Sequence, residues 1–478
     1  MKSIRAFLLM PCAAAALLAG CAMGPSYQRP EIAAPSNWRA PGTDAASLAN
    51  TEWWGYYRDP VLTNLIATAL TNNYDLRIAA ARIEEARGGY RAQRSFLLPS
   101  IGGSANWTRA RAGDIPPSPG VTGGQFDAFG LLSYEVDLWG RIRRLTESAR
   151  AQLLATEEAR KTVQIGLVSS VATTYFNLRS LDRQLQIARD TYASRTNALE
   201  LTSIKFNAEN GLGFGIVSEL DVRQAETQVH TTRSTIAGLE RAIAITENAL
   251  RFLLGQYPGA VPRGETLTAQ WQPAEIPAGL PSELLLRRPD LRAAEQQLIA
   301  ANADIGAARA AYFPTVSLTA ALGVQSVQLD DLFSAGTSRA WKLAPQIAGP
   351  IFNGGRIRAG VQVAKARQKA ALAFYEQAIQ NAFREVEDAL VSITKLREEL
   401  ASEEANVKVE QRRLELSQLR YDEGIASFSD VLDAQRFQFS AELTAVQTRN
   451  NLLAAVAQLY KALGGGWTTS PVRTGKTP

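Results

Sequence analysis

Side chains suited to catalysis or metal binding are scarce in this 478-residue chain. His230 is the only histidine, so no histidine-rich metal site can be assembled. On a predicted helix, between Gln228 and Thr232, a lone histidine is typical of a solvated surface position. The chain also contains no phosphate-binding glycine loop. We therefore predict no catalytic residue, no metal site and no cofactor.

The one covalent modification that the sequence predicts is at Cys21. Residues 1–20 carry Lys2 and Arg5 ahead of an apolar stretch too short to span a bilayer, which is typical of a signal peptide. The residues Leu18-Ala19-Gly20-Cys21 resemble the bacterial lipobox, in which the cysteine is acylated and becomes the first residue of the mature chain. Ala22 then favours the outer membrane, by resemblance to lipoprotein sorting rules. A plain signal peptide with a chance cysteine is the alternative.

The charge balance argues against a nucleic-acid partner. Removal of Lys2 and Arg5 with the signal leaves 49 of the 51 basic residues against 46 acidic ones. Cys12 also leaves with the signal, so no free thiol remains for a disulfide or a nucleophile. No apolar run of 20 residues follows the N-terminus, and we predict no transmembrane helix in the mature chain.

Two Ser-x-x-Asp motifs mark the places where long helical stretches restart. Ser218 precedes Asp221 in "SELD", and Ser427 precedes Asp430 in "SFSD". This spacing predicts a capping box, in which the serine accepts bonds from the free amides of a helix start and the acid bonds back to the serine. Each motif therefore predicts a sharp turn, followed by a helix that runs back along the one before it.

The same order of features occurs twice. The tetrapeptide GRIR begins at Gly140 and again at Gly355, and the same 215-residue offset relates Pro99 to Pro314. After Tyr421 the offset falls to 209, which relates the two Ser-x-x-Asp motifs, because the first copy has six more residues near "NGLGFG". Two copies of one structural unit in tandem imply internal pseudo-symmetry.

This repeat sets the predicted organisation of the chain. We expect a signal peptide over 1–20, a lipid-anchored segment over 21–59, a first repeat over 60–255 with a hairpin at about 100–139, a linker over 256–281, a second repeat over 282–466 with a hairpin at about 315–351, and a tail over 467–478.

Each repeat contains a very long helix. The stretch from Arg141 to Ala208 lacks proline and would extend about 100 Å as a helix. Its apolar residues recur three and four apart, as at Val168, Ala172 and Tyr175. A narrow apolar seam on so long a helix predicts coiled-coil packing against neighbouring helices. An ordinary helical bundle is the alternative, although its helices are far shorter.

Two segments alternate apolar and polar residues with period two, from Phe126 to Leu138 and from Thr315 to Val324. Each predicts a strand with one apolar and one polar face. Partner segments near 101–109 and 341–351 complete two hairpins, the second interrupted by Pro345 and Pro350. We therefore predict four strands per chain.

Strands of about ten alternating residues in an exported lipoprotein match the pattern of a transmembrane β-barrel. Four strands cannot span lipid alone, because the two edges would leave backbone groups unpaired in hydrocarbon. Eight strands from two chains would be filled by side chains, whereas twelve strands from three chains leave a lumen. A trimer is thus the smallest pore. The alternative is a soluble two-hairpin sheet packed on helices.

Motifs along nearly the whole mature chain resemble the outer-membrane efflux lipoproteins of the TolC/OprM/NodT type. These motifs are "CAMGPSYQRP", "WWGYYRDPVLTNLI", "NNYDLRIAAARIEEAR", the long run "LLRRPDLRAAEQQLIAANADIGAARAAYFPTVSLTA", "LDAQR" and "YKALGGGW". The resemblance implies a membrane α+β protein: a homotrimer whose twelve-stranded barrel continues into a periplasmic α-helical barrel. It also implies an exit duct for drugs or other small solutes, joined through a periplasmic adaptor to an inner-membrane transporter of the RND class.

The resemblance further implies a gate at the periplasmic end, where acidic residues near the helical turns narrow the opening. Asp430 matches such a residue by position, with Asp433 one helical turn on and Asp221 as its counterpart in the first repeat. Three Asp430 side chains around one axis would favour cations. The competing interpretation is that Asp221 and Asp430 serve only as caps, and for Asp221 we favour the cap.

The turns themselves are candidate adaptor contacts, over 207–218 and 422–429. Glycines there would let two backbones approach closely. The candidate residues are Gly211, Gly213, Gly215, Ser218, Gly424 and Ser427. The six additional residues of the first turn could distinguish two adaptor grooves.

Two other functions remain open at this point. A type I protein-secretion duct would use the same architecture, although the lipobox and the OprM-like motifs favour efflux. A lipid-anchored periplasmic adaptor also carries a coiled-coil hairpin, but it would have one hairpin rather than two fused copies with membrane-type strands.

Overall fold

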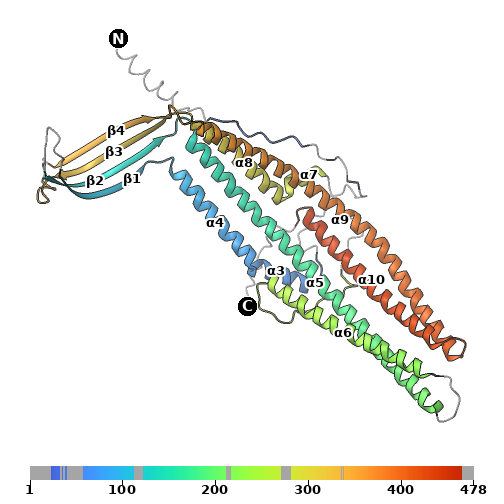
Figure 1. Cartoon of the computed structure of the whole chain (residues 1–478). Coiled ribbons are helices and arrows are strands. Elements are labelled where there is room, and N and C mark those ends of the chain that lie inside the picture. The colour runs from blue at the N-terminus through green and yellow to red at the C-terminus, as the bar shows by residue number, and fades with distance from the viewer. Residues whose placement is uncertain are drawn as a thin grey trace, which may run out of the picture. The chain divides into compact units, whose positions relative to one another are not determined.

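The computed structural model describes residues 23–32, 35, 38–39, 57–111, 122–210, 217–270, 281–334, 336 and 338–465 (Figure 1). The first repeat contains α3 (Pro60–Asn72), α4 (Tyr74–Ser95), β1 (Ser100–Arg111), β2 (Thr122–Val136), α5 (Arg141–Asn210) and α6 (Glu219–Leu253). The second contains α7 (Pro281–Arg287), α8 (Pro289–Ala310), β3 (Thr315–Ser326), β4 (Arg339–Ala348), α9 (Arg356–Asp422) and α10 (Phe428–Ala462). The order helix, hairpin, long helix and return helix thus occurs twice.

These elements form two compact units. The sheet unit comprises Met1–Ile32, Ala81–Glu158 and Arg292–Gln377, and the helical unit comprises Ala33–Ala80, Ala159–Leu291 and Ala378–Pro478. No helix in the described ranges combines the length and apolarity that crossing a membrane requires.

The four strands of the sheet unit form one antiparallel sheet in the order β1-β2-β3-β4. The central pairing joins the two repeats, with Ala128 opposite Val324. Gly323 allows the close approach of β2 and β3, because a Cβ atom there would lie 2.0 Å from the carbonyl oxygen of Ala128. Pro345 lies in β4, which has β3 as its one partner strand in the described part of the chain, and proline within sheets is largely confined to such edge strands.

The register places most of the large apolar residues of the four strands on one face, although Phe129 and Leu131 of β2 lie on the other. Residues directly opposite each other share a face of the sheet, and Trp107 pairs with Phe126 while Leu322 pairs with Trp341. This apolar face consists of Ile101, Trp107, Phe126, Leu132, Tyr134, Val316, Leu318, Leu322, Trp341, Leu343 and Ile347. The other face carries Asn106, Asp127, Ser133, Glu135, Ser317, Thr319, Gln325, Lys342 and Gln346.

Much of this apolar face is open to its surroundings. Trp341 is 77% exposed, Ile347 74% and Leu322 73%. A soluble sheet would bury such a face against a second layer, whereas a strand in lipid directs its apolar side chains outward.

The burial pattern of the long helices confirms the three-and-four spacing of apolar residues that the sequence predicted. Along α5, Val168, Ala172, Tyr175 and Leu178 are all buried, and along α9 the equivalent seam buries Leu390 and Ile393. Within the helical unit, α6 runs back beside α5 and α10 runs back beside α9 (Figure 1). Each pair is therefore a helical hairpin, as the two Ser-x-x-Asp motifs predict.

The two return helices end against equivalent side chains. Asn73 Nδ2 donates to the carbonyl oxygen of Leu253 at the end of α6, at 2.9 Å. Arg288 Nη1 donates to the carbonyl oxygen of Ala462 at the end of α10, at 3.0 Å. The repeat offsets relate Asn73 to Arg288 and Leu253 to Ala462, so each pair satisfies a free carbonyl of a helix end. The pseudo-symmetry is thus kept while the capping side chain changes from an amide to a guanidinium.

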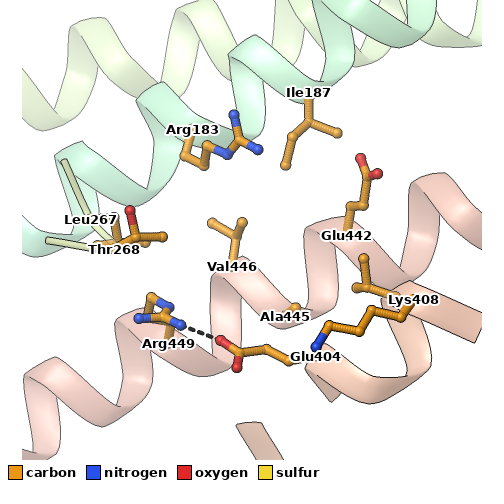
Figure 2. A pocket seen from close by; sticks show the side chains of 11 residues that line it. Arg183, Ile187, Leu267, Thr268, Glu404, Lys408, Glu442, Ala445, Val446 and Arg449 are labelled. Atoms are coloured by element: carbon orange, nitrogen blue, oxygen red, sulfur yellow. Dashed lines mark hydrogen bonds and ion pairs between the residues drawn. The ribbon is translucent and has the colours of Figure 1, made fainter. Parts of the chain in front are cut away.

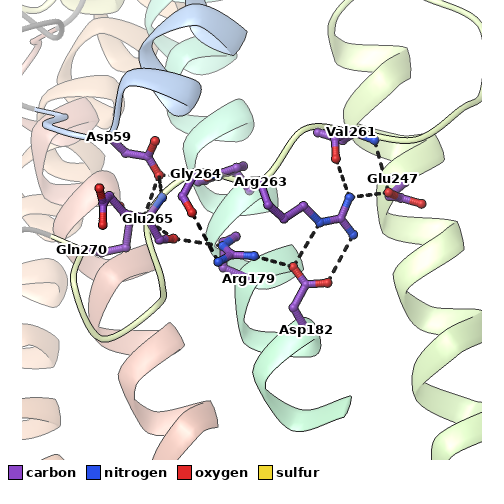
Figure 3. Close-up of polar contacts among 10 residues, drawn as sticks. Asp59, Arg179, Asp182, Glu247, Val261, Arg263, Gly264, Glu265 and Gln270 are labelled. Carbon is purple, nitrogen blue, oxygen red and sulfur yellow. Dashed lines mark hydrogen bonds and ion pairs between the residues drawn. The ribbon is translucent and has the colours of Figure 1, made fainter. Parts of the chain in front are cut away.

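The linker between the repeats is held by polar contacts within the helical unit (Figure 3). Asp59 is 3% exposed, and its Oδ2 accepts from Gln270 Nε2 and from the Tyr175 hydroxyl, each at 2.8 Å. Burial opposes ionisation of Asp59, but these bonds outweigh it and lower the pKa of its carboxyl group. Arg263 of the linker forms a two-pronged ion pair with Asp182 on α5, at 3.1 and 3.2 Å. The buried Asp59 and the partly buried ion pair of Arg263 with Asp182 thus fix the linker against α5.

Candidate functional site

The turn of the second repeat places Asp430 in the first turn of α10. Its Oδ2 accepts from the backbone N–H of Ser427 at 3.0 Å and from the Ser427 hydroxyl at 2.9 Å. The hydroxyl bond, then the amide bond, lowers the pKa of the Asp430 carboxyl group. Asp430 is nevertheless exposed, so it is charged at neutral pH and faces solvent while it caps the helix.

The turn of the first repeat has the same bonds from the serine to the aspartate. Asp221 Oδ2 accepts from the backbone N–H of Ser218 at 2.9 Å and from its hydroxyl at 2.8 Å. The Ser218 hydroxyl in turn accepts from the backbone N–H of Asp221 at 3.3 Å. The bonds from serine to aspartate that a capping box requires are therefore present at both turns, and the Asp430 side chain remains exposed.

Asp433 lies one helical turn beyond Asp430 and forms an ion pair that was not predicted from the sequence. Arg436 Nη2 lies 3.1 Å from Asp433 Oδ1, and both side chains are more than half exposed. The guanidinium of Arg436 also lies 5.2 Å from the ring centroid of Phe437. The Asp-x-x-Arg spacing on a helix was the available signal. Arg436 offsets part of the negative potential of Asp433, and the nearby positive charge of Arg420 acts in the same way on Asp430.

An apolar cluster brings the starts of α6 and α10 together. Ala225, one turn beyond Asp221, packs with Phe428 and Leu432, and Leu199 and Tyr421 pack against them. The ring centroids of Tyr421 and Phe428 are 5.4 Å apart. The two capped turns therefore share one small core, which ties both aspartates to the same end of the helical unit.

Gly424 is the glycine of the predicted turn residues that the structure describes. Its φ of +71° lies in the left-handed region that favours glycine, and its N–H donates to the carbonyl oxygen of Tyr421 at 2.9 Å. The predicted contact residues Gly211, Gly213 and Gly215 lie outside the described residues, as does the predicted lipidation site Cys21. His230 is exposed on α6.

Both hairpins expose apolar side chains at equivalent positions near their turns. Leu201 is 61% exposed and Ile204 56% on α5, and the 215-residue offset relates them to Leu416 and Leu419 on α9, 43% and 57% exposed. Ile425, in the turn itself, is 68% exposed. An apolar pair three residues apart on each helix forms a short stripe suited to a helical partner. The repeat offset could have revealed this pairing in the sequence.

A groove of about 310 Å³ lies farther along the same helices, between the hairpins of the two repeats. Figure 2 shows Arg183 and Ile187 of α5 facing Val446 of α10 across it, and Arg449 forming an ion pair with Glu404. Side chains of both charges line it, and no group of three potential metal ligands occurs in the described part of the chain. The groove thus supplies neither a nucleophile–base pair nor a metal centre.

Comparison with known proteins identifies the family. The family model described as outer membrane efflux protein matches residues 65–256 and 280–465, which correspond to the two repeats. The chain is 41% identical over 474 residues to the solvent efflux pump outer membrane protein SrpC of Pseudomonas putida, covering 97% of this chain and 99% of that protein. It is 37% identical over 466 residues to the cation efflux system protein CusC of Escherichia coli, covering 96% and 98%.

Solved structures agree with this comparison. The fold superimposes on the open state of the MtrE outer membrane channel of Neisseria gonorrhoeae with a TM-score of 0.83 at 34% identity, covering 94% of this chain and 99% of that one. It also matches a membrane protein from Pseudomonas aeruginosa with a TM-score of 0.86 at 35% identity, covering 93% and 100%. The predicted two-repeat α+β channel fold is confirmed, and the chain belongs to the outer membrane efflux protein family.

Proposed function

We propose that three copies of this outer-membrane efflux channel close a twelve-stranded barrel, and that this trimer is the exit duct of a tripartite pump with a periplasmic adaptor and an inner-membrane RND transporter. The observation that carries the proposal is the sheet. It has one apolar face, and neither β1 nor β4 has a partner on its outer edge within the described ranges. Unpaired backbone groups cost several kcal/mol each in hydrocarbon, so the edges require strands from other copies.

Unequal burial of equivalent helices supports the same assembly. α4 and α8 are related by the repeat offset, yet α4 buries only Leu76, Ala79 and Ile83. α8 buries Leu291, Ala293, Ala294, Leu298, Ala300, Asn302, Ala303, Ile305, Gly306, Ala307 and Ala310. Part of the cover on α8 comes from the N-terminal segment, since Asn302 Nδ2 donates to the carbonyl oxygen of Pro25 at 3.0 Å. Tertiary packing supplies most helix stability, so a second copy would cover α4.

Crosslinking tests the closure, because Cys12 and Cys21 are the only cysteines. We would place Ser104→Cys on β1 and Ala344→Cys on β4 in the full chain, and add a short bismaleimide to membranes. The proposal predicts covalent dimers and trimers, and no larger species. Each single substitution is the matched control and should remain monomeric on denaturing gels. A doubly substituted chain that crosslinks only within itself would contradict a barrel built from several copies.

The exposed apolar stripes near the turns are the proposed contact with the adaptor. They lie beside the two capped turns, at the end of the helical unit that holds α6 and α10 together. Equivalent stripes on the two hairpins would offer each adaptor hairpin a similar surface. A coiled-coil partner with an apolar face fits this pattern, because its side chains would cover Leu416 and Leu419.

The double variant Leu416→Asp/Leu419→Asp tests this contact. We expect co-purification with the adaptor to be lost while the oligomeric mass is unchanged. Gln411→Asp adds a charge at an exposed polar site on the same helix and should leave co-purification intact. Loss of the trimer in the double variant would show instead that the stripe contacts a second copy, and retained adaptor binding would exclude the stripe as the contact.

A passive duct requires no catalytic group, and we propose that the protein is not an enzyme. The pump then supplies the energy and selects the solute, whereas the duct conducts it. The Asp430 side chains of three copies would form an acidic ring that favours cations at the periplasmic opening.

A further inference from the structure

Arg195 is a buried cation at the place where three helices of the helical unit meet. The residue is 4% exposed on α5. Its Nη1 donates to Thr232 Oγ1 at 2.6 Å and to the carbonyl oxygen of Gln228 at 3.4 Å, both on α6. Its guanidinium carbon lies 5.4 Å from the ring centroid of Phe439 on α10. Arg195 therefore links the first hairpin to the return helix of the second.

The charge of Arg195 is not neutralised within the described part of the chain. No carboxylate there forms an ion pair with it, and its Nε is buried without a hydrogen-bond partner. Burial lowers the pKa of its guanidinium group, which reports the cost of removing the charge from water. The Oε1 atoms of Gln224 on α6 and Gln435 on α10 are also buried without partners. Each glutamine lies about one helical turn from a residue that contacts Arg195, which is Gln228 on α6 and Phe439 on α10.

The equivalent position in the second hairpin carries an acidic residue that has an ion-pair partner. The 215-residue offset relates Arg195 to Glu410, and Glu410 forms an ion pair with Arg413 on its own helix at 3.2 Å. The 209-residue offset relates Thr232 to Ala441, which is buried and apolar. The uncompensated charge therefore belongs to the first hairpin alone.

The contacts of Arg195 do not offset the free-energy cost of burying its charge. One short hydrogen bond, one long hydrogen bond and one aromatic contact oppose the desolvation of a full positive charge and of an unsatisfied N–H. An apolar residue of similar volume would avoid that cost. Replacement of buried charged residues by well-packed hydrophobic residues is often neutral or stabilising for this reason. The cluster of Ala225, Phe428 and Leu432 holds the starts of α6 and α10 together.

We propose that Arg195 is a built-in destabilising element, which keeps the junction of α5, α6 and α10 close to opening. When α10 moves away from the first hairpin, water reaches the guanidinium and relieves its desolvation. The apolar cluster nearer the turns holds the junction closed, and the desolvation cost of Arg195 lowers the free energy that is needed to open it. The residue thereby positions the channel near the threshold between shut and open at its helical end.

Hydrogen exchange on the full-length protein in detergent or nanodiscs tests this role. Arg195→Met removes the charge and keeps most of the volume, so we expect amides of residues 428–441 to exchange about tenfold more slowly, the factor that one unsatisfied buried donor corresponds to. Single-channel recordings of the same variant should show a smaller open fraction. Arg233→Met, an exposed arginine on α6, is the matched control and should change neither measurement.

A second variant keeps the proposal testable if Arg195→Met folds poorly. Arg195→Gln is neutral and can still bond to Thr232, so it should also slow exchange over residues 428–441 relative to the native chain. Faster exchange or a larger open fraction in either variant would show that Arg195 is a latch, which overturns the proposal. Exchange equal to that of the native chain would overturn it equally, because the buried charge would then carry no net cost.

Discussion

We predict that an arginine substitution on the exposed apolar face of the sheet destabilises the protein if that face contacts lipid, but has little effect if the face contacts water. Leu322 lies near the middle of β3 on that face and is 73% exposed. Thr319 lies three residues away on the polar face and is also exposed. We compare Leu322→Arg with Thr319→Arg, which adds the same side chain to the same strand but on the other face.

The expected magnitude follows from the surroundings of each face. An arginine directed into lipid near the bilayer centre costs about 2–4 kcal/mol, whereas an arginine on the lumen side contacts water. A trimer multiplies the cost, so Leu322→Arg should destabilise the assembled barrel by roughly 6–12 kcal/mol. In a soluble sheet both substitutions would replace exposed side chains and change stability by less than about 0.5 kcal/mol.

The assay is the resistance of the folded oligomer to urea in vesicles, followed by mobility on cold denaturing gels. Leu322→Arg should lower the midpoint strongly or prevent insertion, and Thr319→Arg should keep the native midpoint. Equal midpoints for the two variants would refute the assignment of the apolar face to lipid. A greater loss in Thr319→Arg would mean that the two faces are assigned the wrong way round.

Further outcomes follow from individual contacts. Asp430→Asn with Asp433→Asn should reduce cation selectivity and raise conductance in planar bilayers, and unchanged current and selectivity would remove the gate hypothesis. Because bonds from Ser427 lower the pKa of Asp430, its capping is complete above the ordinary aspartate pKa of about 3.9 and is lost as the pH falls. The protection factors of amides in the first turn of α10, which correct for the intrinsic pH dependence of exchange, should therefore fall below about pH 4, and protection that stays constant with pH would contradict this. Asp59→Ala removes the acceptor of the buried Tyr175 hydroxyl and the N-cap of α3, so it should cost about 3 kcal/mol of unfolding free energy in denaturant titrations, whereas Asp433→Ala at an exposed site should not. Gly323→Ala should impair sheet assembly because of the clash with Ala128, whereas Gly102→Ala, with open space around it, should assemble normally.

Much of the fold could be predicted because its signals are local and occur twice. Proline-free stretches with an apolar seam predicted α5 and α9, and the Ser-x-x-Asp spacing predicted both capping boxes. The β4 strand was harder to predict, since Pro345 and Pro350 break the expected pattern. Its position at an edge of the sheet explains why Pro345 is tolerated there.

The side-chain contacts that join distant segments could not be predicted in the same way. Asp59 meets Gln270 across 211 positions, and Arg195 meets Phe439 through the packing of three helices. Neither contact has a spacing rule, because tertiary structure alone brings these residues together. The capping roles of Asp221 and Asp430 could be predicted because capping is local. Their selection as gate candidates came instead from the family resemblance, and any effect on ions would depend on the proposed assembly of three copies.

The central claim, that this chain forms a gated trimeric duct, is tested most directly by single-channel recording of the detergent-extracted protein, with the oligomeric mass measured on the same sample. We predict the mass of three chains and discrete currents that are mostly small, with occasional larger openings. A single-chain mass with no current, after folding and insertion have been verified, would contradict the duct.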